Sequence, residues 1–184
     1  MTMKEQKKIA KNYARAIFEL ADDLNMQETF LNEIKLINES VLHLKNAKAV
    51  LESLLIPRDE KKELIKKTFA GKINTQVLNF LFLLIEKQRI KLLPEIQDEL
   101  TKLVNKMRGI VVAKVYSPYE LDVSILNGIV ETLRRTVSTN GVKEIKIEQS
   151  IDPELIGGIK VKINDLVYDG SIKGRLENLK RRLG

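Results

Sequence analysis

Residues 152–171 read DPELIGGIKVKINDLVYDGS and predict much of the structure of the C-terminal part of the chain. Asp152 followed by Pro153 predicts a short, capped helical turn. Gly157 and Gly158 predict a bend, or a close approach of two backbone segments that a side chain would block. These residues direct the backbone into turns and caps, and almost none of them is of a type that catalyses a reaction.

The second half of the stretch predicts two strands and the start of a helix. Apolar and polar residues alternate from 159 to 163, which is the period of a half-buried strand. Asn164 and Asp165 favour a tight turn into a short strand at 166–168. The Asp-Gly-Ser at 169–171 ends that strand and caps the last helix. The apolar side chains of that helix are predicted to share one face: Ile172, Leu176, Leu179 and Leu183.

The remainder of residues 110–184 completes a small α+β domain. β-branched residues favour a strand at 110–116, and a shorter strand is expected at 143–149. Between them, Ser117-Pro118-Tyr119-Glu120 has the pattern of a capping box that opens a helix. That helix is expected to end at Asn140-Gly141, with one apolar face: Leu126, Ile129, Leu133 and Val137.

Residues 1–109 are predicted to form an all-helical bundle, because apolar residues recur there with the helical period. Prolines and glycines fall at the expected helix ends, and Asn74 or Thr75 is a candidate cap. The six expected spans are about 4–24, 27–44, 47–55, 58–69, 75–87 and 90–109. The fold class is therefore mainly α: a six-helix bundle at 1–109 followed by a small α+β domain at 110–184.

Composition excludes several classes of protein. The chain has 184 residues, 43% of them hydrophobic and 31% charged, which is typical of a folded protein rich in helix. It has no cysteine, so disulfides, thiolate zinc sites and cysteine nucleophiles are excluded. The densest apolar stretch, 77–85, is far shorter than the roughly 20 residues of a membrane span. No secretory signal is visible, and no direct membrane insertion is expected.

The net charge of +7 is spread along the chain. The one local concentration of cations lies in the last helix: Lys173, Arg175, Lys180, Arg181 and Arg182. This pattern is typical of a solvated helix end, where cations face the negative pole of the helix dipole. Docking to an acidic partner is the other interpretation.

No pattern of catalytic, metal-binding or cofactor-binding residues is present. The single histidine, His43, lacks the serine and acid of a triad, and both phosphate-binding glycine motifs are missing. The acidic pairs Asp22-Asp23 and Asp59-Glu60 fall at predicted helix ends without the spacing of metal ligands. The chain is predicted to be non-catalytic, with no cofactor.

Two helices of the predicted bundle have features of a binding surface. In the first, small residues let another helix approach closely, although packing inside the bundle explains Ala14 and Ala21 equally well: Ala10, Ala14, Ala16 and Ala21. The stretch 77–85 of the fifth is apolar nearly all round, so it is either central or exposes an apolar strip to a partner. Its one polar residue, Asn79, needs hydrogen-bond partners if it is interior, or lies at a rim beside a docked helix.

The ordered motif IDPELIGGI, an alternating strand and DGSIKGRLENL resembles the C-terminal signature of the delta subunit family of F-type ATP synthase, which includes the oligomycin-sensitivity-conferring protein. The runs YARAIF at 13–18 and NFLFLL at 79–84, followed by Arg89, resemble the N-terminal marks of the same family. The resemblance covers nearly the whole chain. Its C-terminal signature comprises Asp152, Gly157, Gly158, Asp169, Gly170 and Ser171.

The resemblance implies a non-catalytic stator protein that links the alpha3beta3 catalytic head to the peripheral stalk formed by the b subunits, so that rotor torque is converted to ATP synthesis. In the family, a groove between the first and fifth helices of the bundle receives the N-terminal helix of an alpha subunit of the head. Carried over residue by residue, this groove comprises Tyr13, Ala16, Leu20, Asn79 and Leu83. The C-terminal domain is implied to engage the C-terminal ends of the b subunits.

The resemblance also implies one copy per complex, a monomer when isolated, and no contact with nucleic acid. The implied location is the cytoplasmic face of the bacterial plasma membrane, or the stromal face of the thylakoid in a plastid. The alternative suggested by the basic charge is an RNA-binding protein with a helical domain and a small α+β domain. The sequence has neither a Gly-x-x-Gly clamp nor an aromatic RNP strand to support it. A small enzyme is the third interpretation, and no candidate site supports it.

Overall fold

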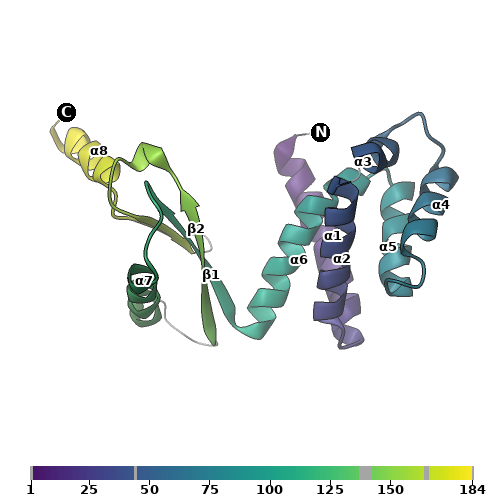
Figure 1. The fold of residues 1–184 in the computed structure, drawn as a ribbon, viewed down its shortest axis with the longest axis horizontal. Helices are drawn as coiled ribbons and strands as arrows, with labels where there is room; N and C mark the ends of the chain where they lie inside the picture. Colours follow the sequence, from purple (N-terminus) through teal and green to yellow (C-terminus); the bar gives the residue numbers. More distant parts are fainter. Residues whose placement is uncertain (1, 44, 137–141, 164–165, 184) are drawn as a thin grey trace. The chain divides into compact units, whose positions relative to one another are not determined.

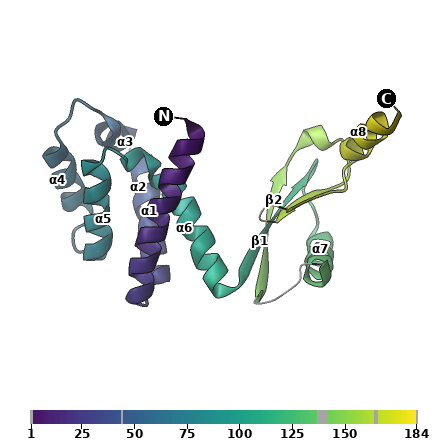
Figure 2. The ribbon, with the colours of Figure 1, turned by 180° about the vertical axis from the view of Figure 1, so that it is seen from behind.

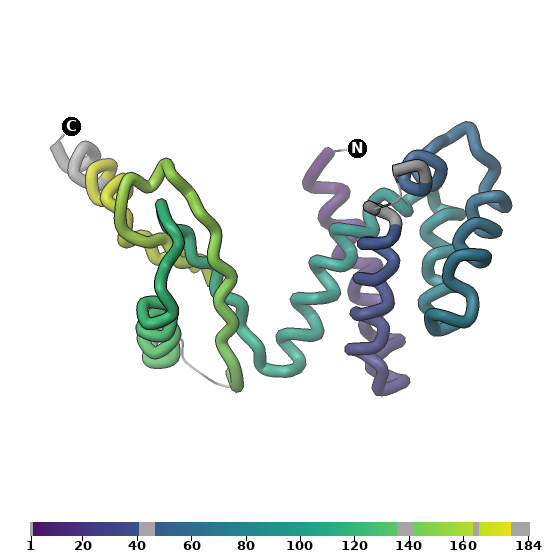
Figure 3. Tube along the Cα trace, viewed as in Figure 1, coloured from purple at the N-terminus to yellow at the C-terminus, as the bar shows by residue number. Residues whose placement is uncertain are grey.

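The computed structural model describes residues 2–43, 45–136, 142–163 and 166–183, and the remaining residues are among those drawn in grey in Figure 3. Within these ranges the side chains at 41–43, 45–46, 136 and 178–183 are not described. The chain divides into two compact units, Met1–Val104 and Asn105–Gly184, and each is described by itself.

The N-terminal unit is built from helices (Figure 1). They are α1 (Met3–Asp23), α2 (Gln27–His43), α3 (Lys45–Glu52), α4 (Arg58–Phe69), α5 (Thr75–Glu86), the short 3₁₀ helix η1 (Ile90–Leu92) and α6 (Leu93–Arg108), which continues past the unit boundary. Thr2 and Glu5 form a capping box at the start of α1, and the side chain of Asn74 caps α5 by accepting from the Gln76 N–H at 3.0 Å.

The third helix is shorter than predicted, because α3 ends at Glu52 and not near residue 55. The backbone carbonyl of Ser53 accepts a hydrogen bond from the ammonium group of Lys61, a buried lysine on α4. The Ser53 hydroxyl accepts from the Leu55 N–H at 3.2 Å, which turns the chain out of the helix. Leu54 and Leu55 are left 80% and 94% exposed.

The core of the N-terminal unit is one apolar cluster shared by all its helices. On α1 the buried positions are spaced by three and four residues, and three of the four are alanines: Ala10, Ala14, Ile17 and Ala21. These small side chains let α1 lie close to α2, which contributes Phe30, Ile34 and Ile37. Packing inside the helical unit therefore explains Ala14 and Ala21.

The C-terminal unit is a four-stranded sheet with helices (Figure 1). Its elements are β1 (Ile110–Ser117), α7 (Val123–Thr136), β2 (Glu144–Ile151), the 3₁₀ helix η2 (Pro153–Leu155), β3 (Lys160–Ile163), β4 (Leu166–Asp169) and α8 (Ile172–Leu183). The strand order is β2-β1-β3-β4, and β1 and β2 are parallel because α7 returns the chain to the same end of the sheet. The pairs β1–β3 and β3–β4 are antiparallel.

One face of this sheet is apolar and packs against α7. Figure 2 shows the ribbon of the sheet and of α7 from behind. On that face Ala113 pairs with Ile147 on one side and Ile163 on the other, and Ile129 and Leu133 of α7 complete the cluster. The opposite face is polar: Lys114 lies between Glu148 and Lys162, and all three are exposed. The alternation predicted for the strands follows from this one-sided burial.

The predicted capping box at Ser117 is wrong. Ser117 is the last residue of β1 and is fully buried, and its carbonyl accepts from the Asp152 N–H at 2.8 Å. Its hydroxyl donates to the Tyr119 carbonyl at 2.6 Å and accepts from the Gln149 side-chain amide of β2 at 3.3 Å, and α7 begins only at Val123. The predicted positions Val137, Asn140, Gly141, Asn164 and Asp165 lie outside the described residues.

The fold class is confirmed at the level of a mainly helical chain with a small α+β unit. In the described residues, α1–α6 come before the first strand, and the sheet belongs to the C-terminal unit.

Candidate partner-binding surfaces

The first candidate surface lies on α1 and α5, and we call it the α1–α5 surface. It comprises Tyr13, Ala16, Leu20, Asn79 and Leu83. On α1, residues 13, 16 and 20 share one face because they are three and four positions apart. Tyr13 is half-buried, whereas the other four side chains are exposed, with Leu20 at 39% and Leu83 at 40%. The surface is therefore partly apolar and open to solvent.

Direct contacts hold α1 against α5 beside this surface. The Tyr13 and Phe80 rings meet edge to face, with 6.1 Å between their centroids. An Arg89 guanidinium nitrogen donates to the Tyr13 hydroxyl at 3.0 Å, and its central carbon lies 5.6 Å from the Tyr13 ring centroid. Tyr13 is thus held by Phe80 of α5 and by Arg89, which follows α5 in the chain.

The backbone after α5 directs Arg89 toward Tyr13. Gln88 has a φ of 54°, in the left-handed region, and the Arg89 N–H donates to the Leu84 carbonyl at 2.7 Å. Many helices end in this way, with one residue in the left-handed conformation after the last turn, and that residue is usually glycine. A glutamine in that conformation is uncommon.

Exposure separates the small and polar residues of the two helices. Ala16 is the alanine of α1 that faces solvent, whereas Ala10, Ala14 and Ala21 are fully buried. Asn79 is exposed on α5, so its amide does not need a partner inside the protein. On the same helix Val77, Phe80, Leu81, Leu84 and Ile85 are buried, so α5 is both a core helix and a source of the exposed Leu83.

In the C-terminal unit, the signature residues around η2 act as caps and close contacts. The Asp152 carboxylate accepts from the Glu154 N–H at 3.1 Å and so caps η2. Gly158 has a φ of 78°, and a Cβ there would lie 2.5 Å from the Gly170 carbonyl oxygen. A Cβ at Gly157 would lie 2.7 Å from the side chain of Ile172. The two glycines therefore let η2 lie against the start of α8.

The start of α8 is held by a compact polar cluster of Asp169, Ser171 and Gly174. One carboxylate oxygen of Asp169 accepts from the Ser171 hydroxyl at 2.6 Å and from the Ser171 N–H at 2.9 Å. The Ser171 oxygen accepts from the Gly174 N–H at 3.0 Å, which is the geometry of an N-cap. Hydrogen bonds from the Ser171 side chain and backbone lower the pKa of Asp169. A Cβ at Gly174 would lie 2.8 Å from the Asp169 carboxylate.

The second candidate surface is an apolar groove beside α7, with a volume of about 460 Å³, and we call it the α7 groove. Its lining comes from α7, from β3 with the residue before it, and from β4: Ile125, Gly128, Ile129, Thr132, Leu133, Ile159, Val161 and Tyr168. Ile125 and Tyr168 are 44% and 40% exposed. Exposed apolar side chains around a groove are typical of binding sites, which makes the α7 groove a candidate.

Sequence reasoning missed the α7 groove and the contact between Arg89 and Tyr13. The groove had one local signal, the glycine at 128 inside a predicted helix, where glycine is unfavourable. The Arg89 contact joins residues far apart in the chain, and no local pattern reports it. The exposed Ile156 was missed as well: its φ is 63°, which is rare for a β-branched residue.

The described residues contain no cluster of acidic or histidine side chains that could hold a metal ion. Asp22 of the first acidic pair accepts from the Gln27 side chain at 2.6 Å, and Asp59 and Glu60 lie in the first turn of α4, where the helix dipole favours them. The side chain of His43 lies outside the described residues.

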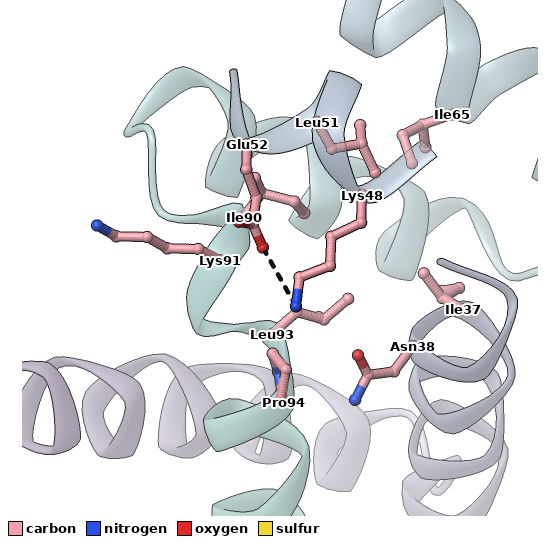
Figure 4. Close-up of a pocket in the computed structure, with 10 residues that line it drawn as sticks. All are labelled: Ile37, Asn38, Lys48, Leu51, Glu52, Ile65, Ile90, Lys91, Leu93 and Pro94. Carbon is pink, nitrogen blue, oxygen red and sulfur yellow. Dashed lines mark ion pairs between the residues drawn. The ribbon is translucent and has the colours of Figure 1, made fainter. Parts of the chain in front are cut away.

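A small cavity in the N-terminal unit is too small for a ligand (Figure 4). Its volume is about 30 Å³, the space of about two water molecules. Lys48 and Glu52 of α3 form an ion pair at 4.0 Å across it, and Asn38 of α2 donates to the Gln97 side chain at 2.7 Å.

Among the helices of the described residues, none combines the length and the apolar character needed to span a bilayer.

These observations define a class: a two-unit protein whose candidate sites are exposed apolar surfaces, one on each unit. Comparison with known proteins gives the family. The family model "ATP synthase delta (OSCP) subunit" matches residues 9–183. The chain is 30% identical to ATP synthase subunit delta of Bacillus licheniformis over 178 residues, covering 97% of this chain and 95% of that protein. It is 35% identical to the same protein of Halalkalibacterium halodurans over 178 residues, covering 95% and 94%.

The fold is also that of a solved structure. A chain of the mitochondrial ATP synthase hexamer of Toxoplasma gondii aligns over 100% of this chain and 98% of its own, with a TM-score of 0.75 and 16% identity. The chain belongs to the ATP synthase delta (OSCP) subunit family. It is therefore a peripheral-stalk stator component and is not itself catalytic. This assignment replaces the interpretation as an RNA-binding protein.

Proposed function

We propose that the two units grip different partners, so that the chain ties the catalytic head of the ATP synthase to its peripheral stalk. In this proposal α1–α6 act together as a six-helix bundle at 1–109 that binds the head, and residues 110–184 bind the stalk. The observation that carries the proposal is the presence of one exposed apolar docking surface on each unit. The role is mechanical: it holds the head still while the rotor turns.

The α1–α5 surface is the proposed site for the N-terminal helix of an alpha subunit. The small side chain of Ala16 leaves room for a partner helix to approach α1. Leu20 of α1 and Leu83 of α5 supply exposed apolar contacts. An amphipathic helix binds such a surface through its apolar face, with its own backbone hydrogen bonds intact. The clamp of Arg89 and Phe80 on Tyr13 keeps α1 and α5 together while a load acts on the surface.

The C-terminal unit is the proposed partner of the C-terminal ends of the b subunits.

One copy per complex sits on a three-fold head. One surface cannot meet three alpha subunits equally, so we expect their N-termini to be bound unequally. The isolated chain is expected to be a monomer. The complex places it at the cytoplasmic face of the bacterial plasma membrane, or the stromal face of the thylakoid in a plastid, without inserting into the bilayer.

The test of the head contact is a titration of the full chain with a peptide that carries the N-terminal helix of the alpha subunit. We expect nanomolar affinity, about −12 kcal/mol, because the contact must outlast many turnovers. Ala16→Asp buries a charge against the peptide and weakens binding by about 2–3 kcal/mol. Asn32→Asp adds the same charge at an exposed position of α2 and serves as the matched control. Unchanged affinity of Ala16→Asp would remove the α1–α5 surface as the site.

The stalk contact is tested by recovery of the tagged full chain from detergent-solubilised membranes. We expect the alpha, beta and b chains to be recovered together with it. Recovery of the head chains without b would leave the C-terminal unit without its proposed partner.

A further inference from the structure

Arg89 is a cation without a carboxylate partner, and it contacts the α1–α5 surface through Tyr13. Its guanidinium donates to the Tyr13 hydroxyl at 3.0 Å and lies over the Tyr13 ring. None of the ion pairs among the side chains that the structure describes includes Arg89. Arg89 is half-buried, and a guanidinium that has lost part of its water is stabilised by a nearby carboxylate. Another molecule can supply that carboxylate.

The end of α5 does not provide the missing partner. Glu86 is the acidic residue nearest to Arg89 in sequence, and it pairs with Lys62 of α4 at 2.6 Å, a hydrogen bond that lowers the pKa of Glu86. The negative pole of the α5 dipole favours cations near this end of the helix, such as the exposed Lys87. The dipole does not explain why the Arg89 side chain reaches across to α1.

The Tyr13 hydroxyl also has a hydrogen to donate. A phenol hydroxyl carries one O–H donor and accepts through its lone pairs. Arg89 uses the oxygen as an acceptor, and in the described part of the chain no group accepts from the Tyr13 O–H. A carboxylate has two oxygens, so a single one can accept from the Tyr13 O–H and from a further Arg89 N–H together.

The two donors are held in place within the chain itself. The Tyr13 ring meets the Phe80 ring edge to face, with 6.1 Å between their centroids. The Arg89 backbone is fixed by the left-handed Gln88 and by the hydrogen bond from the Arg89 N–H to the Leu84 carbonyl. Because both donors are already oriented, less conformational freedom is lost when a carboxylate binds to them.

We propose that Arg89 and Tyr13 together bind a carboxylate on the helix that occupies the α1–α5 surface, an aspartate or glutamate beside the apolar face of that helix. The inference rests on the proposed function of this surface and adds the chemistry that selects its occupant. Leu20 and Leu83 suit any amphipathic helix, whereas the Arg89–Tyr13 pair favours one with an acidic residue in the matching register. Arg89 is thus the specificity-determining residue.

The experiment titrates the full chain with a peptide of the N-terminal helix of the alpha subunit of the same organism. Further peptides carry each Asp or Glu changed in turn to its amide. We expect one amide change to weaken binding by about tenfold to a hundredfold, the range of a hydrogen bond to a charged group. Arg89→Met keeps a long apolar side chain and should weaken binding of the unchanged peptide to the same extent. The same amide change should then have no further effect on Arg89→Met.

Lys87→Met is the matched control, because it removes the same charge from an exposed side chain two residues away. Its affinity should stay within about twofold of the wild-type value. Tyr13→Phe keeps the ring, removes the hydroxyl and should weaken binding less than Arg89→Met. Wild-type binding should fall more steeply with salt than binding of Arg89→Met. A purely structural Arg89 would change neither the salt dependence nor the effect of the amide peptide.

A charge exchange keeps the test decisive if Arg89→Met loses stability. Arg89→Glu should bind the unchanged peptide at least about tenfold more weakly. It should regain affinity when the acidic residue identified by the amide series is changed to lysine in the peptide. Partial unfolding of the N-terminal unit cannot produce such a recovery.

The outcomes separate this inference from the proposed function. Wild-type affinity for a peptide with every carboxylate changed to its amide overturns the inference, and the α1–α5 surface stays the site if Ala16→Asp still weakens binding. Failure of the wild-type chain to bind the unchanged peptide removes the head contact itself. Equal losses in Arg89→Met for the unchanged and the amide peptides, without recovery by charge exchange, make Arg89 a structural clamp and overturn the inference.

Discussion

The two units of this chain reach a defined shape by different means. The N-terminal unit is held by a large apolar cluster to which every helix contributes, and its candidate binding residues lie outside that cluster or at its edge. The C-terminal unit has a much smaller apolar cluster and depends on glycines, caps and a buried serine to fix its turns. The candidate surface of the N-terminal unit therefore rests on a packed core, whereas that of the C-terminal unit rests on backbone geometry.

The largest expected effect tests the packing side of this comparison. Leu81 of α5 is fully buried, and Leu81→Ala should lower the free energy of unfolding of the N-terminal unit by about 2–5 kcal/mol. Leu83→Ala, two residues away and 40% exposed, should change it by less than about 1 kcal/mol yet weaken binding of the alpha peptide. Denaturant titration followed by helical circular dichroism measures the first, and peptide titration the second. Equal losses of stability would contradict the division between core and surface on α5.

The next largest effect tests the geometric side. Gly158→Ala should destabilise the C-terminal unit by about 3 kcal/mol, because it adds a clash with the Gly170 carbonyl to the cost of a left-handed residue. Gly71→Ala is the matched control: its φ is 77°, and its Cβ would meet no atom within 4 Å. That variant should cost only about 1–2 kcal/mol. Hydrogen exchange in each unit measures both, and equal costs would mean that the close approach at Gly158 is not needed.

A smaller effect is expected at the cap of α8. Ser171→Ala removes the acceptor of the Gly174 N–H and should lower the stability of α8 by about 1 kcal/mol. Ser150→Ala, at an exposed position of β2, is the control and should have little effect. Amide exchange in the first turn of α8 is the measurement. Unchanged protection there would show that the helix start is held by its glycine contacts alone.

The smallest effect concerns acid. The pKa of Asp169 is lowered from its ordinary value of 3.8 by the hydrogen bonds from Ser171. A carboxyl whose pKa is lowered on folding stabilises the fold above its unfolded pKa, and this contribution disappears as the pH falls through the lowered value. The cap of α8 should therefore stay intact at neutral pH and loosen only below pH 3.8. Carbon-13 NMR of the Asp169 carboxyl measures the midpoint, and Ser171→Ala should move it upward.

What the sequence could predict follows from how local each feature is. The cap at Asp152 and the Asp-Gly-Ser at 169–171 use partners two or three residues away, so their pattern predicted their geometry. The pattern at Ser117 was misleading because the same serine was needed to finish a strand. A local motif cannot report that a neighbouring element already uses its hydroxyl.

Features that depend on distant contacts were beyond the sequence. The helical period places Ala10, Ala14 and Ala21 on one stripe of α1 and Ala16 off it, but which side of the helix is buried depends on where α2 and α5 pack. The contact between Arg89 and Tyr13 joins two residues that are 76 positions apart in the chain. The α7 groove arises only when α7 covers part of the sheet and leaves β3 and β4 partly open.

The strand order β2-β1-β3-β4 has a consequence for the life of the chain before assembly. β1 is made first but lies between two strands that come later, so during synthesis both of its edges lack partners until β2 and β3 have emerged from the ribosome. The helices of the N-terminal unit find their core partners within residues 1–104 and can fold before that point. A nascent chain would thus have its proposed head-binding surface ready while the unit proposed to bind the stalk is still being translated.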